Sequence, residues 1–436
     1  MKEISQQPVE NAAQDVVSTR ERGSFTPAEA RNRDLRDSRA ALIASFAGWT
    51  LDAFDFFLVV FCLTSIGQTF HESDARIALS ITATLAFRPV GAIVIGLWAD
   101  RYGRRLPFIV NVLFYATTEA LTGLVHSYGM FIVVRALFGI GMGGQWGVGA
   151  SLAMEKVPIQ RRGVLSGLLQ QGYALGSILA AVGYFFVAVR WGWRPLFFVS
   201  SVPALLLAFF VYFRVRESQV WKKSKRPAWG DLQRDLRVNW KLLVYMSVFL
   251  TMMHFAAHGT QDMYPTFLER EWHLNVVQRS SIVGVSMFGA ILGGIMVGYF
   301  SDRWGRRRAI IGALSCGILV IPLWAYAHSS TALVLGAFIM QWAVMGAWGV
   351  IPAHFAELSP GSVRAFLPGF AYQIGALLSS AVVYLEAVLA QFYTEYANAM
   401  ALIAVCSLVL ASVLAAVGQE RRGTLFEGQD GPNFVR

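Results

Sequence analysis

Long apolar runs recur along the chain and are separated by short polar segments. An α-helix rises about 1.5 Å per residue, so about 20 residues cross the roughly 30 Å hydrocarbon core of a bilayer. Apolar runs of about 18 residues or more therefore predict transmembrane helices. Twelve such runs occur, at residues 41–66, 77–99, 106–125, 130–153, 164–189, 195–213, 242–268, 280–300, 309–327, 332–354, 366–390 and 397–417.

A hydrophilic connection between the sixth and seventh runs divides the chain into two sets of six. It extends from Arg214 to Lys241 and is rich in arginine and lysine. The segments that we predict from this division are a tail at 1–40, a first half at 41–213, a linker at 214–241, a second half at 242–417 and a final tail at 418–436.

The composition is that of a polytopic membrane protein. Of the 436 residues 55% are hydrophobic and 15% are charged, against about 25% charged in soluble domains, and the mean hydropathy is +0.49. The net charge of +10 comes mostly from short segments between the apolar runs, so it indicates topology and a lipid bilayer rather than nucleic-acid binding. By the positive-inside rule, the basic segments place both termini in the cytoplasm. Residues 1–40 lack the apolar core of a signal peptide, so we expect the first helix to direct the chain to a bacterial-type inner (plasma) membrane.

An internal repeat relates the two halves. The segment from Gly96 to Arg105 recurs in similar form from Gly298 to Arg307, so that Asp302 follows Asp100 by 202 residues. Two parallel six-helix halves, related by a pseudo-twofold axis along the membrane normal, explain such a repeat. The same offset pairs Trp146 with Trp348, Gly147 with Gly349, Glu155 with Glu357, Arg162 with Arg364 and Gln171 with Gln373.

These motifs carry a resemblance to a known family. The pattern G-x-x-x-D-R-x-G-R-R after the second run, repeated after the eighth, resembles the signature loop of the major facilitator superfamily. On the fourth run, Arg135-x-x-x-Gly139-x-Gly141-x-Gly143-Gly144 resembles the second motif of that family. The resemblance implies an all-α membrane protein with twelve transmembrane helices in two pseudo-symmetric halves around a central cavity. The fifth run lacks the Gly-Pro pair of the family's antiporter motif, which favours symport or uniport.

The repeated loops carry acids and arginines where helices end. A carboxylate there can accept hydrogen bonds from a neighbouring helix N-terminus or from an arginine. We therefore predict a cytoplasmic latch that holds one face of the transporter closed, with positive topology signalling as the alternative. The residues assigned to this gating role are Asp100, Arg101, Arg104, Arg135, Glu155, Arg162, Asp302, Arg303, Arg306, Glu357 and Arg364.

Three charged residues lie inside the first two runs. Asp52 and Asp55 are three residues apart on one helix and are candidates for proton coupling; the alternative is a structural role, bonded to backbone or to Arg135. Arg88 lies in the middle of the second run, too deep to reach water easily. Its planar donors suit either a substrate carboxylate or an internal aspartate. We favour the substrate.

The seventh run contains more polar groups than a lipid-facing helix tolerates. His254, His258, Gln261 and Asp262 form a stripe at helical spacing, which predicts a solute pathway. Gly259 and Pro265 suggest a local kink in this helix or a close approach of its backbone to a neighbour. The spacing of the two histidines would allow a metal ion, but no third ligand follows, so we predict neither a metal nor a cofactor.

The end of this stripe also carries a resemblance. His258-Gly-Thr260-Gln261-Asp262-x-x-x-Thr266 resembles the seventh-helix motif of fungal lactate and pyruvate proton symporters, N-x-x-[ST]-H-x-[ST]-Q-D-x-x-x-T. His254 replaces the asparagine and Ala257 replaces the serine or threonine of that motif. The resemblance implies substrate translocation by His258, Gln261, Asp262 and Arg88.

The first run resembles a second group of relatives. Its D-x-x-D pair is similar to the first-helix motif of aromatic-acid and sialate proton symporters, with Ala53 where many of those have glycine. Both resemblances lie within one group of carboxylate permeases.

The repeat adds further candidates for a central site. Gln145, Tyr372 and Gln373 are assigned to substrate binding. The aromatic residues here have packing as their alternative role. The remaining candidates are Trp146, Gln341, Trp342 and Trp348, and two acids whose direction the sequence does not give, Glu119 and Glu386.

The function that we predict is proton-coupled import of small monocarboxylates such as lactate or pyruvate. Arg88 would bind the carboxylate, Asp262 would compete for Arg88 or take the proton, and the partners would be a small organic anion and a proton. A symporter for sialic acid or aromatic acids is the alternative, and a transporter-like sensor is a further one. The chain has no phosphate loop, nucleophile elbow or metal-ligand set, so we do not expect an enzyme. We expect a monomer.

Overall fold

Helices account for all the regular structure in the parts of the chain that are described. The computed structural model describes residues 27–223, 228–393 and 395–426. The predicted tail at 1–40 therefore lies largely outside the described residues. Its last part, from Pro27, is already helical and continues into the first predicted span.

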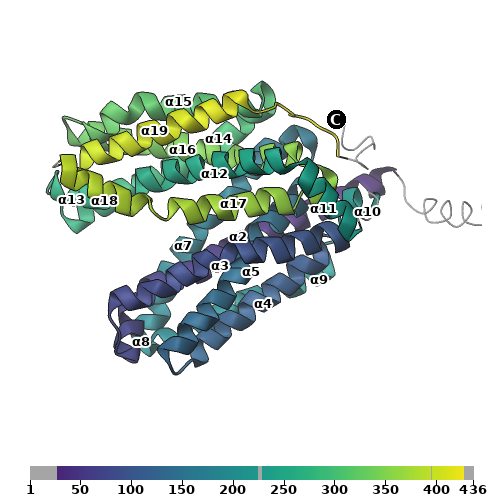
Figure 1. Cartoon of the computed structure of the whole chain (residues 1–436), viewed down its shortest axis with the longest axis horizontal. Coiled ribbons are helices and arrows are strands. Elements are labelled where there is room, and N and C mark those ends of the chain that lie inside the picture. The colour runs from purple at the N-terminus through teal and green to yellow at the C-terminus, as the bar shows by residue number, and fades with distance from the viewer. Residues whose placement is uncertain (1–26, 224–227, 394, 427–436) are drawn as a thin grey trace, which may run out of the picture.

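Two bundles of helices lie side by side, and a short linker with two small helices joins them at one end (Figure 1). The first bundle, here called the N-terminal half, contains α2 (Pro27–Phe70), α3 (Asp74–Tyr102), α4 (Arg105–Leu124), α5 (Tyr128–Met154), η1 (Ile159–Arg161), α6 (Arg162–Gln170), α7 (Gly172–Gly183), η2 (Tyr184–Ala188), α8 (Val189–Trp191) and α9 (Trp193–Arg214). The linker contains α10 (Gln219–Lys223) and α11 (Trp229–Val238). The second bundle, the C-terminal half, contains α12 (Trp240–Gln261), α13 (Tyr264–Arg270), α14 (Val276–Trp304), α15 (Arg306–Ala325), α16 (Ser330–Leu358), η3 (Gly361–Val363), α17 (Phe366–Ser379), α18 (Val382–Tyr393) and α19 (Tyr396–Val417).

The helices are long and apolar enough for a polytopic membrane protein. Among the described residues, 11 helical stretches satisfy the length and composition of a membrane span. The predicted span without a counterpart among the 11 is the third, 106–125. It corresponds to α4, a helix of 20 residues that contains Asn111 and Glu119. Twelve transmembrane helices therefore remain a prediction, whereas the all-helical membrane architecture is confirmed.

The seventh predicted span is two helices rather than one. Its helix α12 ends at Gln261 and α13 begins at Tyr264, so the break falls at Asp262 and Met263. Pro265 is the reason: it fits the first turn of a new helix but has no N–H for the hydrogen bond that would continue the old one. The sequence predicted a kink here, and the structure breaks the helix. A similar break at Ser380 and Ala381 separates α17 from α18.

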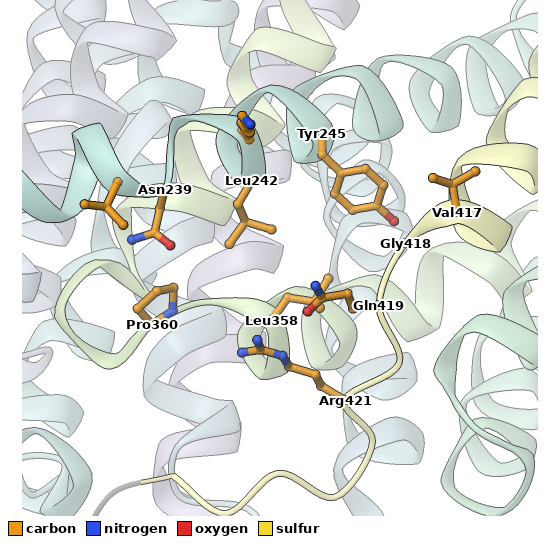
Figure 2. Close-up of a pocket in the computed structure, with 11 residues that line it drawn as sticks. Asn239, Leu242, Tyr245, Leu358, Pro360, Val417, Gly418, Gln419 and Arg421 are labelled. Carbon is orange, nitrogen blue, oxygen red and sulfur yellow. The ribbon is translucent and has the colours of Figure 1, made fainter.

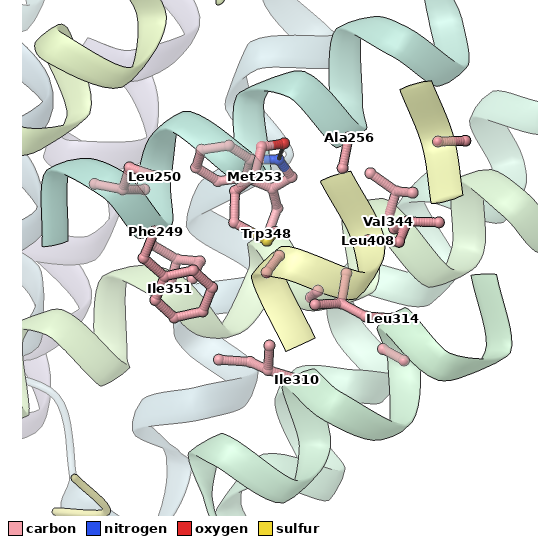
Figure 3. Close-up of a cluster of buried hydrophobic side chains, with 14 of the residues drawn as sticks. Phe249, Leu250, Met253, Ala256, Ile310, Leu314, Val344, Trp348, Ile351 and Leu408 are labelled. Carbon is pink, nitrogen blue, oxygen red and sulfur yellow. Dashed lines mark hydrogen bonds between the residues drawn. The ribbon is translucent and has the colours of Figure 1, made fainter. Parts of the chain in front are cut away.

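Each half has its own hydrophobic core. Figure 3 shows the core of the C-terminal half, where Phe249, Leu250 and Met253 of α12 pack with Leu314 of α15 and Leu408 of α19. Because lipid tails are as apolar as these side chains, helix association within a membrane depends on close packing rather than on hydrophobic burial.

Close packing also fixes the position of Arg88. On α5, a Cβ atom at Gly143 would lie 1.9 Å from the carbonyl oxygen of Arg88 on α3, so only glycine allows this approach. The glycine-rich motif thus brings α3 against α5.

Candidate functional site

The two halves hold each other's helix ends at the end of the molecule that carries the linker, here called the latch end. Asp100, at the end of α3, accepts hydrogen bonds from the backbone N–H groups of Ala365 (3.0 Å) and Phe366 (2.9 Å), where α17 begins. Asp302, at the end of α14, accepts from those of Gly163 (2.8 Å) and Val164 (3.0 Å), where α6 begins. A carboxylate at a helix N-terminus is favoured by the unpaired N–H groups and by the helix dipole.

Two buried ion-pair groups accompany these contacts. In the first, Arg104 binds Asp100 (2.6 Å) and Glu155 (3.0 Å), and Arg364 reaches the same Glu155 oxygen (3.4 Å) from the other half. Burial alone would raise the pKa of Glu155, but Arg104 and Arg364 outweigh it and hold that pKa below its ordinary value.

The second group repeats the arrangement in the C-terminal half. Arg306 binds Asp302 (2.7 Å) and Glu357 (2.9 Å), and Arg162 comes from the N-terminal half to Glu357 (3.0 Å). The predicted gating residues Asp100, Arg104, Glu155, Arg162, Asp302, Arg306, Glu357 and Arg364 therefore lie in two related clusters that join the halves.

The motif glycine makes this geometry possible. Gly103 and Gly305, which follow the two aspartates, have φ values of 105° and 103°, a backbone conformation that residues with a Cβ rarely adopt. Each turn leads into the next helix, and an acid that the sequence analysis missed caps that helix. Glu217 accepts from the backbone N–H of Arg104 (2.8 Å), and Glu420 accepts from that of Arg307 (2.9 Å). The signal was available, because each glutamate follows the last helix of its half.

Three residues assigned to the latch lie outside its ion pairs. The guanidinium carbon of Arg101 lies 4.6 Å from the ring centroid of Trp229, and that of Arg303 lies 4.2 Å from the ring of Tyr299. Arg135 pairs with Glu119 (2.8 Å), and both side chains are buried inside the N-terminal half. Arg135 and Glu155 stand 20 residues apart along α5, about 30 Å, so grouping Arg135 with the latch was wrong.

The segment after α19, Gly418 to Phe426, crosses the latch end; we call it the C-terminal strap. The Phe426 ring lies between the guanidinium carbons of Arg162 (4.0 Å) and Arg364 (3.8 Å), one from each half, and Phe426 is only 2% exposed. The carbonyl of Thr424 accepts from Arg162 (3.2 Å).

The start of the strap borders a cavity of about 470 Å³. Figure 2 shows Leu242 and Tyr245 of α12 opposite Gly418, Gln419 and Arg421 of the strap. The Tyr245 hydroxyl donates to the carbonyl of Leu414 at the end of α19 (3.1 Å).

Away from the latch, the halves meet through a cluster of aromatic rings around Tyr372 of α17. The ring of Trp146, on α5, stacks on Tyr372 with 4.5 Å between centroids, and Trp49 of α2 meets it edge-on at 5.8 Å. From the C-terminal half, His254 and Trp348 approach the same ring at 4.7 Å and 5.8 Å. Trp49 was not among our candidates, although it lies three residues before Asp52.

Arg88 lies beside this cluster. Its guanidinium carbon is 5.8 Å from the Tyr372 ring centroid, and the residue is only 6% exposed. Within the described ranges no carboxylate lies within ion-pair distance of Arg88, and its Nε has no hydrogen-bond partner. The Asp52 and Asp55 carboxylates are fully buried and likewise have no hydrogen-bond partner among the described residues. Neither acid therefore makes a hydrogen bond to the backbone or to Arg135 in the described geometry, and the role of both acids stays a prediction.

The predicted polar stripe follows one side of α12. His258 Nδ1 and Asp262 Oδ2 are 3.0 Å apart, and their side chains are 38% and 37% exposed. Gln261 donates to Gln341 of α16 (2.6 Å). His254 Nδ1 lies 2.8 Å from the carbonyl of Leu250, so this nitrogen carries the proton, while its Nε2 has no partner among the described groups.

The two predicted glutamine ligands differ in position. Gln373 donates to the carbonyl of Gly143 in the other half (3.0 Å) and thus lies at the junction between the halves. Gln145 accepts a hydrogen bond from Asn111 (3.0 Å) inside the N-terminal half. Gln145 and Asn111 take no part in the ring contacts around Tyr372. No group of three or more metal-ligating side chains occurs among the described residues.

The family model of the major facilitator superfamily matches residues 44–269 and 263–430 of this chain, nearly its whole length. The chain belongs to the major facilitator superfamily. The relatives of this chain include membrane transporters.

Two of these relatives have names that mention acids. A carboxylic acid transporter protein homolog of Saccharomyces cerevisiae is 29% identical over 418 residues, which cover 86% of this chain and 67% of the yeast protein. The sialic acid transporter NanX of Escherichia coli is 26% identical over 361 residues, covering 81% and 88% of the two chains. Among solved structures, the proton:xylose symporter XylE superposes with a TM-score of 0.72 at 17% identity, over 90% of this chain and 98% of that chain. This likeness confirms the major facilitator fold.

Proposed function

We propose that this major facilitator transporter imports small monocarboxylates, of the lactate or pyruvate type, together with a proton. The observation that carries the proposal is Arg88, a buried cation beside the Tyr372 ring, with no carboxylate partner in the described ranges. An unpaired buried charge is costly, and a substrate carboxylate that binds the guanidinium in bidentate fashion would remove much of that cost.

The C-terminal half would hold the rest of the substrate. His258 and Gln261 would hydrogen-bond the 2-hydroxy or 2-keto oxygen, and Asp262 would compete with the substrate for Arg88 or take the proton. The partial exposure of His258 and Asp262 at the break between α12 and α13, within a predicted membrane span, supports contact with a solute, since lipid-facing polar groups would be unfavourable. Tyr372 and Gln373 would define the floor of the site toward the latch end.

Asp52 and Asp55 are our candidates for the coupled proton. Burying an ionised carboxylate without a partner costs several kcal/mol, and binding of a proton removes that cost. Coupling is physically useful, because about 2.3 kcal/mol per charge per 100 mV opposes an anion entering a negative cell interior. One accompanying proton cancels this opposition, and a pH gradient adds about 1.4 kcal/mol per unit.

The latch would control access to the site. In this proposal the latch end and both termini face the cytoplasm of an inner membrane, and the monomer works by rocking its halves. The described contacts close the latch end, so the substrate would enter from the opposite end.

The printed names of the two relatives support a carboxylate substrate in general terms. They also keep open our alternative, a symporter for sialic acid or aromatic acids. Counterflow of labelled lactate against unlabelled lactate, sialic acid or 4-hydroxybenzoate in liposomes separates these substrates.

The central test is Arg88→Ala in reconstituted liposomes with an imposed pH gradient. Loss of a charge-assisted contact should lower kcat/KM for lactate uptake about 10- to 100-fold. Arg88→Lys keeps the charge but not the planar fork and should recover only part of the activity. Arg190→Ala, which removes an exposed arginine, is the matched control. Unchanged uptake by Arg88→Ala would exclude the carboxylate assignment.

A further inference from the structure

Besides Glu357 of the latch, the C-terminal half contains the buried acid Glu386. The proposed mechanism does not use Glu386. It lies on α18, is 0% exposed, and neither carboxylate oxygen has a hydrogen-bond partner among the described residues. A purely structural carboxylate would be expected to accept hydrogen bonds from N–H or O–H groups around it, because burial without them is unfavourable.

The carboxylate faces α12 at the polar stripe. A Cβ atom at Gly259 would lie 3.5 Å from Glu386 Oε1, so the oxygen packs against the backbone of that helix. Gly259 and Asp262 are three residues apart and therefore share one side of the helix. Asp262 therefore follows the side of α12 that Glu386 approaches at Gly259.

Few other titratable groups surround Glu386. Among the described residues, α12 and α19 make the main packing contacts with α18. From the end of α12 and the break that follows it come His258 and Asp262, whose side chains are 3.0 Å apart. From α19 comes the apolar side chain of Ile403, whereas the thiol-bearing Cys406 is exposed.

The backbone supports a site here as well. The break between α12 and α13 falls at Asp262, and that between α17 and α18 falls five residues before Glu386. Discontinuous membrane helices are where transporters commonly place their coupling-ion sites.

We propose that Glu386 is a proton-binding residue of the C-terminal half and exchanges one proton with Asp262. The O–H bond of the Glu386 carboxylic acid breaks as one forms on the Asp262 carboxylate, and the pair keeps a single negative charge. Because the proton moves within the pair, the exchange does not change the net charge beside the substrate ligands His258 and Gln261. The inference rests on the proposed proton symport.

Glu386→Gln separates this role from substrate binding. For electroneutral symport of one proton with one anion, a gradient of one pH unit supports about tenfold accumulation of lactate. We expect Glu386→Gln to lose this accumulation while counterflow of labelled against unlabelled lactate, which needs no net proton movement, stays within about twofold of wild type. Glu386→Asp, which restores a carboxylate, should recover part of the accumulation. Glu395→Gln, which changes an exposed acid, is the control.

Each other outcome has a distinct meaning. Accumulation by Glu386→Gln equal to wild type would overturn the role of Glu386 and leave the symport proposal intact. Loss of counterflow as well as accumulation, in a variant that elutes as a single folded species, would show a structural role and would also overturn it. Wild-type protein that exchanges lactate but accumulates none in a pH gradient would instead exclude proton symport itself, and with it this inference.

Discussion

The indole ring of Trp146 stacks on the phenol ring of Tyr372, with 4.5 Å between centroids and 22° between planes. The two rings come from α5 and α17, so the halves meet at the centre through an apolar contact rather than an ion pair. Arg88 lies beside this contact, where in our proposal both halves act on one small anion.

Tyr372→Ala tests this contact. The substitution removes an aromatic pair worth about 0.5–1.5 kcal/mol and should raise the KM for uptake roughly 3- to 10-fold. Tyr372→Phe keeps the stacking and should stay closer to wild type. Leu378→Ala, an exposed residue of the same helix, serves as the control. A KM for Tyr372→Ala equal to that of Leu378→Ala would contradict a role for the ring in the site.

Asp100→Asn and Asp302→Asn test the latch. Each substitution weakens the acceptor of two backbone N–H groups and removes one of the two acids that a buried arginine binds. Complete loss of a buried partner costs about 3–5 kcal/mol, so we expect part of that loss. We expect both variants to open more often at the latch end. Maleimide labelling of Ala353→Cys, in a background without the native cysteines, reports the opening, because Ala353 is fully buried. Equal labelling in all variants would exclude a closing role for the aspartates.

Phe426→Ala tests the C-terminal strap. The ring contacts one arginine from each half, and each cation–π contact is worth about 1 kcal/mol. Labelling at Ala353→Cys should therefore increase, by less than in the aspartate variants. Leu425→Ala changes the exposed neighbouring residue and should label like wild type. If both strap variants label alike, Phe426 does not hold the latch.

Glu155 predicts how stability responds to acid. Its pKa is held below the ordinary value, so the stability that it contributes is complete above the ordinary glutamate pKa of about 4.3 and is lost as the pH falls through the lowered value. Melting temperatures would be measured in detergent from about pH 3 to about pH 7, a range that includes this ordinary pKa. Below about pH 4 they should fall more steeply for wild type than for Glu155→Gln. Parallel curves for the two proteins would contradict this linkage.

The sequence predicted the latch better than the centre of the molecule, and the reason is physical. Asp100 and Asp302 occupy equivalent positions of the repeat, each at the end of a helix. A carboxylate there commonly accepts hydrogen bonds from a neighbouring helix N-terminus or an arginine, so these contacts could be predicted. The direction of Glu386 could not be predicted, because an apolar run that is hydrophobic on all sides does not show which side packs against protein.

Arg135 was assigned to the wrong place for a related reason. It belongs to a glycine-rich family motif, and we grouped it with the latch by that association rather than by its distance along α5. Its partner, Glu119, lies 16 residues earlier on another helix, and pairing across helices requires a three-dimensional register that the spacing within one helix does not contain.

The crossed aspartates make the latch end resemble an isologous dimer interface. Asp100 belongs covalently to the first half but completes the start of α17, and Asp302 belongs to the second half but completes the start of α6. Each half thus supplies a carboxylate acceptor from the end of one helix and backbone N–H donors from the start of another. Residues within each half, rather than the linker, therefore align the two halves at the latch end. The same kind of contact is made in both directions.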